Sequence, residues 1–120
     1  MSGFATFVVE LLGGVGPVSV RRMFGGAGVY LEGVMFGLIA EDVLYLKADD
    51  ALRADLVAAG SAPFIWTPRT GPRAGEAVDM GYLRMPEAAL DDPDEACAWG
   101  RRALAVARAK TPARKRKPRA

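Results

Sequence analysis

The sequence contains no histidine and only one cysteine, Cys97, and these two shortages exclude several kinds of site. Without histidine, the chain lacks the commonest general base, the commonest metal ligand and any Ser-His or Cys-His pair. A single cysteine cannot form an internal disulfide, a CxxC redox pair or a cysteine zinc cage. We therefore expect no catalytic residues, no cofactor and no metal ion, and we expect that the protein is not an enzyme.

The acidic residues do not replace these missing groups. They lie at expected turns and helix starts, where capping and solvation account for them. No loop has the ligand spacing of a calcium site, and no carboxylate pair is placed for acid–base work. Cys97 lies beside the apolar stripe of the last expected helix, so we interpret it as a small buried hydrophobe, not a reactive thiol.

Long hydrophobic runs are also missing. The longest candidate, residues 34–40, is far shorter than the roughly 18 to 20 residues that span a bilayer. Residues 1–14 are apolar, but they lack a basic segment and carry Glu10 in their middle, so they indicate a helix and not a signal peptide. The sequence therefore predicts a cytoplasmic protein without a membrane partner.

Negative charge is missing from the last eleven positions, although the whole chain has a net charge of only +2. Six of the 16 basic residues lie there, namely Lys110, Arg114, Lys115, Arg116, Lys117 and Arg119. The remaining body holds 10 basic and 14 acidic residues, which gives it a net charge of −4. We predict a folded domain over residues 1–109 and a disordered basic tail over residues 110–120.

The composition of this tail permits one kind of binding. Its positive charges can attract phosphates, but without aromatic residues it can neither stack on bases nor read them. We therefore expect weak, non-specific nucleic-acid binding by the tail, and a purely solubilising role is the alternative.

The rest of the chain, 51% hydrophobic over its full length, is large enough for one domain with its own core. Apolar spacing predicts helices at residues 3–12, at 51–59 behind an Asp49 or Asp50 cap, and from Pro93 to about 109 behind an Asp91 or Asp92 cap. Strands are expected at residues 18–24, 29–31, 34–40, 43–47, 64–66 and 77–85. Because two-residue turns join the first strands, the pattern predicts an α+β protein with an antiparallel meander of about four to six strands.

The strand expected at residues 34–40 is apolar on both alternate sets of positions. Such a pattern is typical of a central strand that is covered on both faces, or of one that is paired within a dimer. A homodimer formed through the sheet edge or the sheet face is therefore a possible assembly.

Two features near residue 25 suggest anion binding but have simpler explanations. On a strand, Arg21 and Arg22 point to opposite faces and cannot form one clamp. We expect one of them to pair with a carboxylate of the body and the other to meet solvent or a partner. The glycines of residues 25–28 are followed by a strand, not a helix, so we predict a turn or bulge there and not a phosphate cradle.

Residues 21–30, Arg-Arg-Met-Phe-Gly-Gly-Ala-Gly-Val-Tyr, resemble the RRMFGGxGxY signature of the TfoX N-terminal (Sxy-like) family. The similarity continues through residues 33–39 and 44–47, and its order and spacing extend over about residues 3–107. The motif positions are Arg21, Arg22, Met23, Phe24, Gly25, Gly26, Gly28 and Tyr30.

This resemblance implies a two-layer α+β domain in which helices pack on one antiparallel sheet. Family members with a second, C-terminal domain are bacterial regulators of natural competence, linked to transcription activation. The chain is thus expected to be a stand-alone N-terminal module that regulates by contacting a protein partner or itself. The alternative is a small-molecule sensor with its ligand between sheet and helices, near Trp66 and Trp99.

Overall fold

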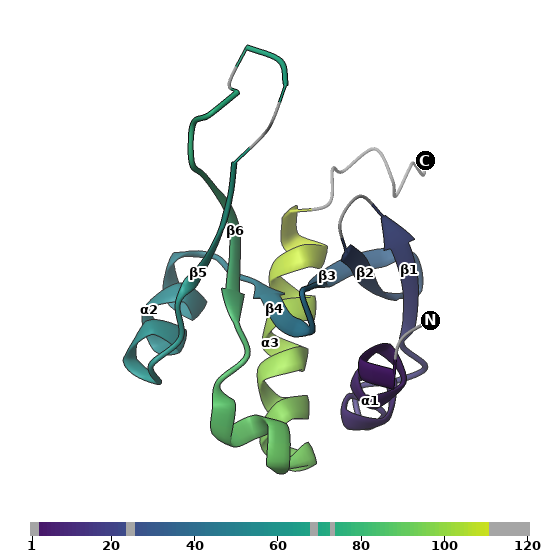
Figure 1. Cartoon of the computed structure of the whole chain (residues 1–120). Helices are drawn as coiled ribbons and strands as arrows, with labels where there is room; N and C mark the ends of the chain where they lie inside the picture. Colours follow the sequence, from purple (N-terminus) through teal and green to yellow (C-terminus); the bar gives the residue numbers. More distant parts are fainter. Residues whose placement is uncertain (1–2, 24–25, 68–69, 73, 111–120) are drawn as a thin grey trace, which may run out of the picture.

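The computed structural model describes residues 3–23, 26–67, 70–72 and 74–110, and within them it contains three α-helices, one 3-10 helix and six strands (Figure 1). In chain order these are α1 (Gly3–Leu11), β1 (Ser19–Met23), β2 (Gly26–Leu31), β3 (Val34–Ala40), β4 (Val43–Lys47), α2 (Asp50–Ala58), β5 (Pro63–Trp66), β6 (Val78–Arg84), η1 (Glu87–Asp91) and α3 (Pro93–Lys110). The predicted helices and strands are all present, with small shifts at their ends.

The six strands form one antiparallel sheet in the order β1-β2-β3-β4-β6-β5. The first four strands form the predicted meander, and the last two join the sheet out of chain order. After β4 the chain passes through α2, so it is free to lay β5 at the outer edge and to return with β6 beside β4. The β5–β6 hairpin then projects from the sheet on the side away from α1 (Figure 1).

Two tight turns fix the register of the meander. Glu32 and Gly33 have φ values of 52° and 81°, and Glu41 and Asp42 have φ values of 51° and 59°. Two successive residues in the left-handed region are typical of the hairpin turn whose twist matches that of the flanking strands. The turns predicted between β2 and β3 and between β3 and β4 are thus both present.

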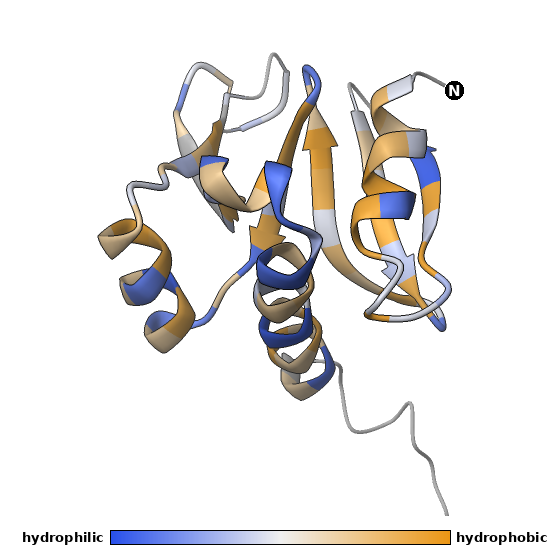
Figure 2. Ribbon diagram, turned by 90° about the horizontal axis from the view of Figure 1, so that it is seen from below, coloured by the Kyte–Doolittle hydropathy of each residue, from blue (hydrophilic) through white to orange (hydrophobic). Residues whose placement is uncertain are grey.

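The helices pack on one face of the sheet only, which gives the predicted two-layer α+β architecture. Seen from below, α1 and α3 lie on the viewer's side of the strands (Figure 2). The core between the layers combines strand residues with residues of α1 and α3; its members include Val8, Leu12, Val29, Leu31, Phe36, Ile39, Leu44, Leu46, Leu83, Ala96 and Ala103. These strand residues alternate along β2, β4 and β6, as expected for a sheet with one buried face.

The glycine-rich segment corrects the prediction for β2, which begins at Gly26 and not at Val29. Gly26 and Gly28 pair with Ala40 and Leu38 of β3, so both are strand residues and not turn residues. A Cβ atom on Gly26 would overlap the carbonyl oxygen of Ile39. Close approach between neighbouring strands, which local sequence does not reveal, therefore explains a glycine here.

The helix caps are those that the sequence predicts. The Asp49 carboxylate accepts a hydrogen bond from the Leu52 amide at 2.9 Å and caps α2. The Asp92 carboxylate accepts from the amides of Asp94 and Glu95 at the start of α3. The last helix continues to Lys110, and the rest of the predicted tail, residues 111–120, lies outside the described residues.

Candidate functional site

The face of the sheet that turns away from the helices carries a continuous group of aromatic, apolar and basic side chains. We call it the open face and define it by Arg21, Tyr30, Met35, Leu38, Tyr45, Lys47, Phe64, Tyr82 and Arg84. Residues directly opposite each other on antiparallel strands share a face. The pairs Leu38↔Tyr45, Tyr45↔Arg84 and Lys47↔Tyr82 therefore connect β3, β4 and β6 across this surface.

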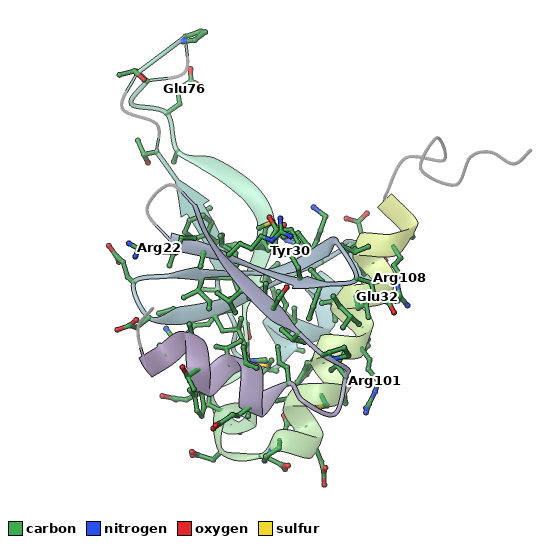
Figure 3. All side chains as sticks on the ribbon, turned by 90° about the vertical axis from the view of Figure 1, so that its right-hand side faces the viewer. Arg22, Tyr30, Glu32, Glu76, Arg101 and Arg108 are labelled. Carbon is green, nitrogen blue, oxygen red and sulfur yellow. The ribbon has the colours of Figure 1, made fainter. Side chains whose placement is uncertain are left out.

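The same rule adds β1 and β2 to the open face. Arg21 lies opposite Gly28, which lies opposite Leu38, and Tyr30 lies opposite Met35. Figure 3 shows Tyr30 on the side of the sheet away from α1. Arg21 and Arg84 are exposed and the other members are half-buried, so these side chains remain partly accessible to a partner.

All three tyrosines of the protein belong to the open face, and one more aromatic ring extends it. The rings of Tyr45 and Phe64 lie 4.8 Å apart between centroids and are tilted by 56°. The Tyr30 ring covers Gly28, because a Cβ atom there would lie 2.8 Å from Tyr30 Cε1. Packing an aromatic ring over a strand glycine shields the exposed backbone and holds the ring flat on the sheet.

Basic side chains lie next to these rings. The Arg21 guanidinium is 5.4 Å from the centroid of the Tyr30 ring, and Lys47 Nζ is 5.0 Å from the centroid of the Tyr82 ring. Arg84 is the register partner of Tyr45 on the neighbouring strand. Such cation–π contacts contribute about 0.5–1 kcal/mol each at exposed sites, and they place positive charge beside the ring faces.

Charge is distributed unevenly between the two layers. Among the described side chains of the open face, the charged ones are Arg21, Lys47 and Arg84, which are all basic. Many acidic residues lie instead at the hairpin turns and at the starts of α2 and α3, and the side chain of Asp79 on β6 is outside the described side chains. The open face is therefore positive although the body carries a net charge of −4.

The Tyr82 side chain is half-buried on the open face, and this changes the pKa of its phenol. Burial raises the pKa of the Tyr82 phenol above its usual value of 10.0, and the neighbouring Tyr30 phenol raises it further through charge repulsion. The Lys47 ammonium also faces this ring.

We expect the Tyr82→Phe substitution to remove a phenol that titrates above pH 10. Between the unfolded and the folded pKa the native state holds more protons, so the free energy of unfolding falls as pH rises from about 10. Titration of phenolate absorbance would measure the pKa of Tyr82. Urea unfolding at several alkaline pH values would measure the fall in the free energy of unfolding. Tyr30→Phe should lower the pKa of Tyr82 toward 10.0, and a wild-type Tyr82 pKa at or below 10.0 would contradict this account.

The two arginines of the motif behave differently from one another. They point to opposite sides of β1, as predicted, since Arg22 is the partner of Ala27, whose side chain is in the core. The expectation that one of them pairs with a carboxylate is wrong for the described part of the chain. Arg21 contacts the Tyr30 ring instead, while Arg22 is exposed (Figure 3).

The other motif residues shape the β1–β2 hairpin. Met23 ends β1, and Gly26, Gly28 and Tyr30 belong to β2, while Phe24 and Gly25 lie outside the described residues. Of the motif, Arg21, Gly28 and Tyr30 thus lie on the open face. Of the predicted nucleic-acid-binding tail, Lys110 ends α3, and Arg114, Lys115, Arg116, Lys117 and Arg119 lie outside the described residues.

Cys97 is buried, as predicted, with 5% of its surface exposed. Its thiol donates a hydrogen bond to the Leu11 carbonyl at 3.4 Å, which ties α3 to the end of α1. Within the described residues, no cluster of three or more histidine, cysteine or acidic side chains could hold a metal ion. Over the same residues, every helix is too short or too polar to cross a membrane.

A groove of about 250 Å³ lies between α2 and α3 and is the relevant feature for a small ligand. It is lined by Asp49, Ala51, Leu52, Arg102, Ala105, Val106 and Ala109. Its volume is below the roughly 300–1,000 Å³ of ordinary ligand pockets. It also lies between two helices, whereas the sensor hypothesis needs a cavity between helices and sheet.

The tryptophans give no separate support to a sensor. Trp99 is partly buried against the core, its indole donates to Glu95 at 3.2 Å, and Arg102 lies over its ring. These contacts account for Trp99 as a structural residue on α3. The side chain of Trp66 is outside the described side chains.

The open face was not predicted from the sequence, although a signal for it was present. Tyr30, Tyr45 and Tyr82 each occupy the strand position that alternates with a core residue, such as Leu31, Leu46 or Leu83. Only the strand order and register show that these separate positions meet on one surface. The half-buried Met35 and Leu38 lie there as well, which explains why β3 is apolar on both alternations.

Comparison with protein-family models gives a match over residues 10–107, to the TfoX N-terminal domain. The matched region extends from α1 to the last turn of α3 and includes the whole sheet. A comparison with curated proteins gives no match.

Proposed function

Because this chain belongs to the TfoX N-terminal domain family over nearly its whole length, we propose that it is a non-catalytic regulatory domain that acts by binding. Family membership supports a domain like those of competence regulators. In this proposal the folded body binds its partner through the open face, and the basic tail adds weak, non-specific contacts to nucleic acid. The observation that carries the proposal is the aromatic and basic character of a sheet face that the helices leave uncovered.

An antiparallel sheet with one face toward water normally alternates apolar residues inside with polar residues outside. The open face departs from this rule, because Met35, Leu38 and Phe64 lie on it beside the three tyrosines. Aromatic residues, methionine and arginine are the residue types enriched where proteins bind partners. Such a surface favours an interaction role over a purely solvated one.

The absence of histidine and the burial of Cys97 support a non-catalytic role. Both features remove common nucleophile and base pairs from the chemistry open to the described residues. Regulation by binding needs none of these groups, whereas it does need an accessible surface with specific shape and charge.

Affinity capture from a bacterial lysate tests the proposal with two matched variants of the full chain. The triple face variant carries Arg21→Gln, Lys47→Gln and Arg84→Gln. The triple control variant carries Arg22→Gln, Arg102→Gln and Arg108→Gln, which removes the same charge from exposed positions elsewhere. It also removes the exposed ion pairs of Arg102 with Asp55 and of Arg108 with Glu32, at a cost of about 0–1 kcal/mol each. Captures with and without nuclease separate protein partners from nucleic acid.

We expect the wild type and the triple control variant to retain the same partner and the triple face variant to lose at least about 90% of it. This loss corresponds to about 1.4 kcal/mol or more, the order of one charge-assisted hydrogen bond. Circular dichroism should show the same melting temperature for both variants within a few degrees. Equal capture by all three chains would show that the open face does not bind.

A further inference from the structure

We propose that the open face binds single-stranded nucleic acid, with Arg21, Lys47 and Arg84 contacting phosphates and tyrosine rings stacking on bases. This inference rests on the proposed function, because it names the partner of the same surface. It differs from the role given to the tail, which has charge but no aromatic residue and so cannot stack.

The spacing of the rings suits consecutive bases. Tyr30, Tyr45 and Tyr82 stand on β2, β4 and β6, which follow one another in the sheet with only β3 between the first two. Tyr45 lies opposite Leu38 and Arg84, so it is displaced along the strands from Tyr30 and Tyr82, and the three rings form a triangle. Neighbouring strands are about 4.8 Å apart, so this triangle extends over roughly 14 Å across the strands. Sheets that present aromatic rings on an uncovered face typically stack two or three bases in this way.

The basic side chains of the open face indicate a negatively charged partner. The described charged side chains of the open face are basic and lie beside the rings, with Arg21 at Tyr30 and Lys47 at Tyr82. A partner with a regular row of negative charges next to flat apolar groups complements both features. Nucleic acid has this alternation, whereas an acidic peptide offers carboxylates without flat rings.

A second copy of the same face fits less well. Face-to-face pairing would bring Arg21, Lys47 and Arg84 of one chain toward the same basic residues of the other. Like charges that meet in an interface disfavour that pairing. The sequence suggested a dimer because β3 is apolar on both alternate sets of positions. Contact of Met35 and Leu38 with bound bases would explain the same pattern.

Single strands are favoured over duplexes by the form of the surface. The rings can contact only the flat faces of bases, and in a duplex those faces are stacked on one another. Duplex DNA would meet only the three basic residues of the open face and the tail. Binding of duplex should therefore depend on salt but hardly on the tyrosines.

Fluorescence anisotropy with the full chain tests the inference at low salt. The probes are a labelled oligothymidine of about 20 nucleotides, longer than the site of one such face, a duplex of equal length, inorganic polyphosphate as competitor and labelled polyglutamate. The proteins are the wild type, the triple face variant, the triple control variant, and the single variants Tyr45→Leu and Tyr82→Leu. Because every variant keeps the tail, its contribution is constant.

We expect the triple face variant to bind oligothymidine at least about tenfold more weakly than the triple control variant. Its slope of log affinity against log salt should be less negative by about 2, since each of three phosphates contributes about 0.7 on a single strand. Tyr45→Leu and Tyr82→Leu should each weaken oligothymidine binding by about fivefold or more, the order of one lost base stack, with an unchanged salt slope. Neither leucine variant should alter binding of polyphosphate, which lacks bases.

Three outcomes would overturn the inference. Oligothymidine binding that is equal in the triple face and control variants would assign it to the tail. Leucine variants that bind oligothymidine like the wild type would exclude stacking. Polyglutamate that loses affinity in the triple face variant, while oligothymidine does not, would make the partner an acidic protein and leave the proposed function standing.

Failure of the proposed function itself would give a different result. Lysate capture would be equal for all three chains, and the triple face variant would bind every probe with the same affinity as the triple control variant. Amide chemical shifts of the wild-type chain provide a test that needs no substitution. On adding oligothymidine, shifts at residues 28–30, 45–47 and 82–84 support the inference. Shifts confined to residues 110–120 contradict it.

Discussion

Replacing Phe36 with alanine is expected to lower the free energy of unfolding by about 3–5 kcal/mol. Phe36 is fully buried at the point where the pairing of β2 and β3 shifts, since Val29 lies opposite Gly37 and Tyr30 lies opposite Met35. The shift leaves Phe36 as an additional residue in β3 and turns its ring into the core. The ring thus occupies a place that no other residue of β3 can fill.

The neighbours of Phe36 explain why the cavity would not close. A Cβ atom on Gly100 of α3 would lie 3.9 Å from Phe36 Cε2 and 3.2 Å from Leu12 Cδ2. At Gly100, therefore, α3 approaches both the sheet and the end of α1. Because the surrounding helices and sheet cannot close the space, the variant loses the transfer free energy of the ring. In addition, the open cavity lowers its stability further.

Urea unfolding monitored by circular dichroism measures this effect, and Phe7→Ala is the matched control because Phe7 is 37% exposed on α1. The control should cost about 1 kcal/mol or less, since little apolar surface changes its environment. If Phe36→Ala unfolds the chain entirely, Phe36→Leu should still fold with a loss of roughly 1–1.5 kcal/mol. Equal losses for Phe36→Ala and Phe7→Ala would contradict the assignment of Phe36 to the core.

Most helices and strands could be predicted because their signals are local. The helical spacing in residues 3–12 and the Asp49 and Asp92 caps report on neighbours within four positions of each other. The same holds for the turn at Glu32-Gly33, whose conformation depends on the residues within it. Each of these features was confirmed, with most helix and strand ends shifted by one or two residues.

The strand order and the start of β2 could not be predicted, because both depend on contacts between distant segments. Propensity favours a turn wherever glycines cluster, and this led to the wrong boundary at Val29. The actual cause of Gly26 is the carbonyl oxygen of Ile39 on the next strand, and that of Gly28 is the ring of Tyr30 lying over it. A local pattern contains neither fact.

The candidate site has the same limitation. Alternation shows that Tyr30, Tyr45 and Tyr82 face away from the core, but only the position of β6 beside β4 brings Tyr82 toward the other rings. Likewise, the opposite directions of Arg21 and Arg22 were predictable, whereas the cation–π partner of Arg21 was not. The sequence motif thus marks one hairpin, and the fold extends it into a surface of six strands.

Replacing Gly26 with alanine is expected to cost about 3 kcal/mol, at the upper end of the usual range for overpacking. The added methyl group would overlap the carbonyl oxygen of Ile39, which is backbone in the paired strand β3. Unlike the end of a side chain, this oxygen can move only if the pairing of Gly26 with Ala40 is disturbed. The substitution therefore opens the end of the β2–β3 ladder, next to the β1–β2 hairpin.

Gly28→Ala is the control, because it lies two residues away on the same strand and meets only movable atoms. A Cβ atom there would contact Tyr30 Cε1 at 2.8 Å and Met35 Sδ at 3.2 Å, and both side chains can rotate away. Its stability loss should be about 1 kcal/mol or less, partly offset because alanine reduces the entropy of the unfolded chain. Urea unfolding of both variants measures the difference, and a loss for Gly26→Ala no larger than that for Gly28→Ala would refute the backbone contact.

Because Gly28→Ala displaces the Tyr30 ring while leaving the fold intact, it should also weaken binding at the open face, whereas Gly26→Ala acts first on stability. The two glycines of one motif would then be separated by experiment into one that the sheet requires and one that the surface requires.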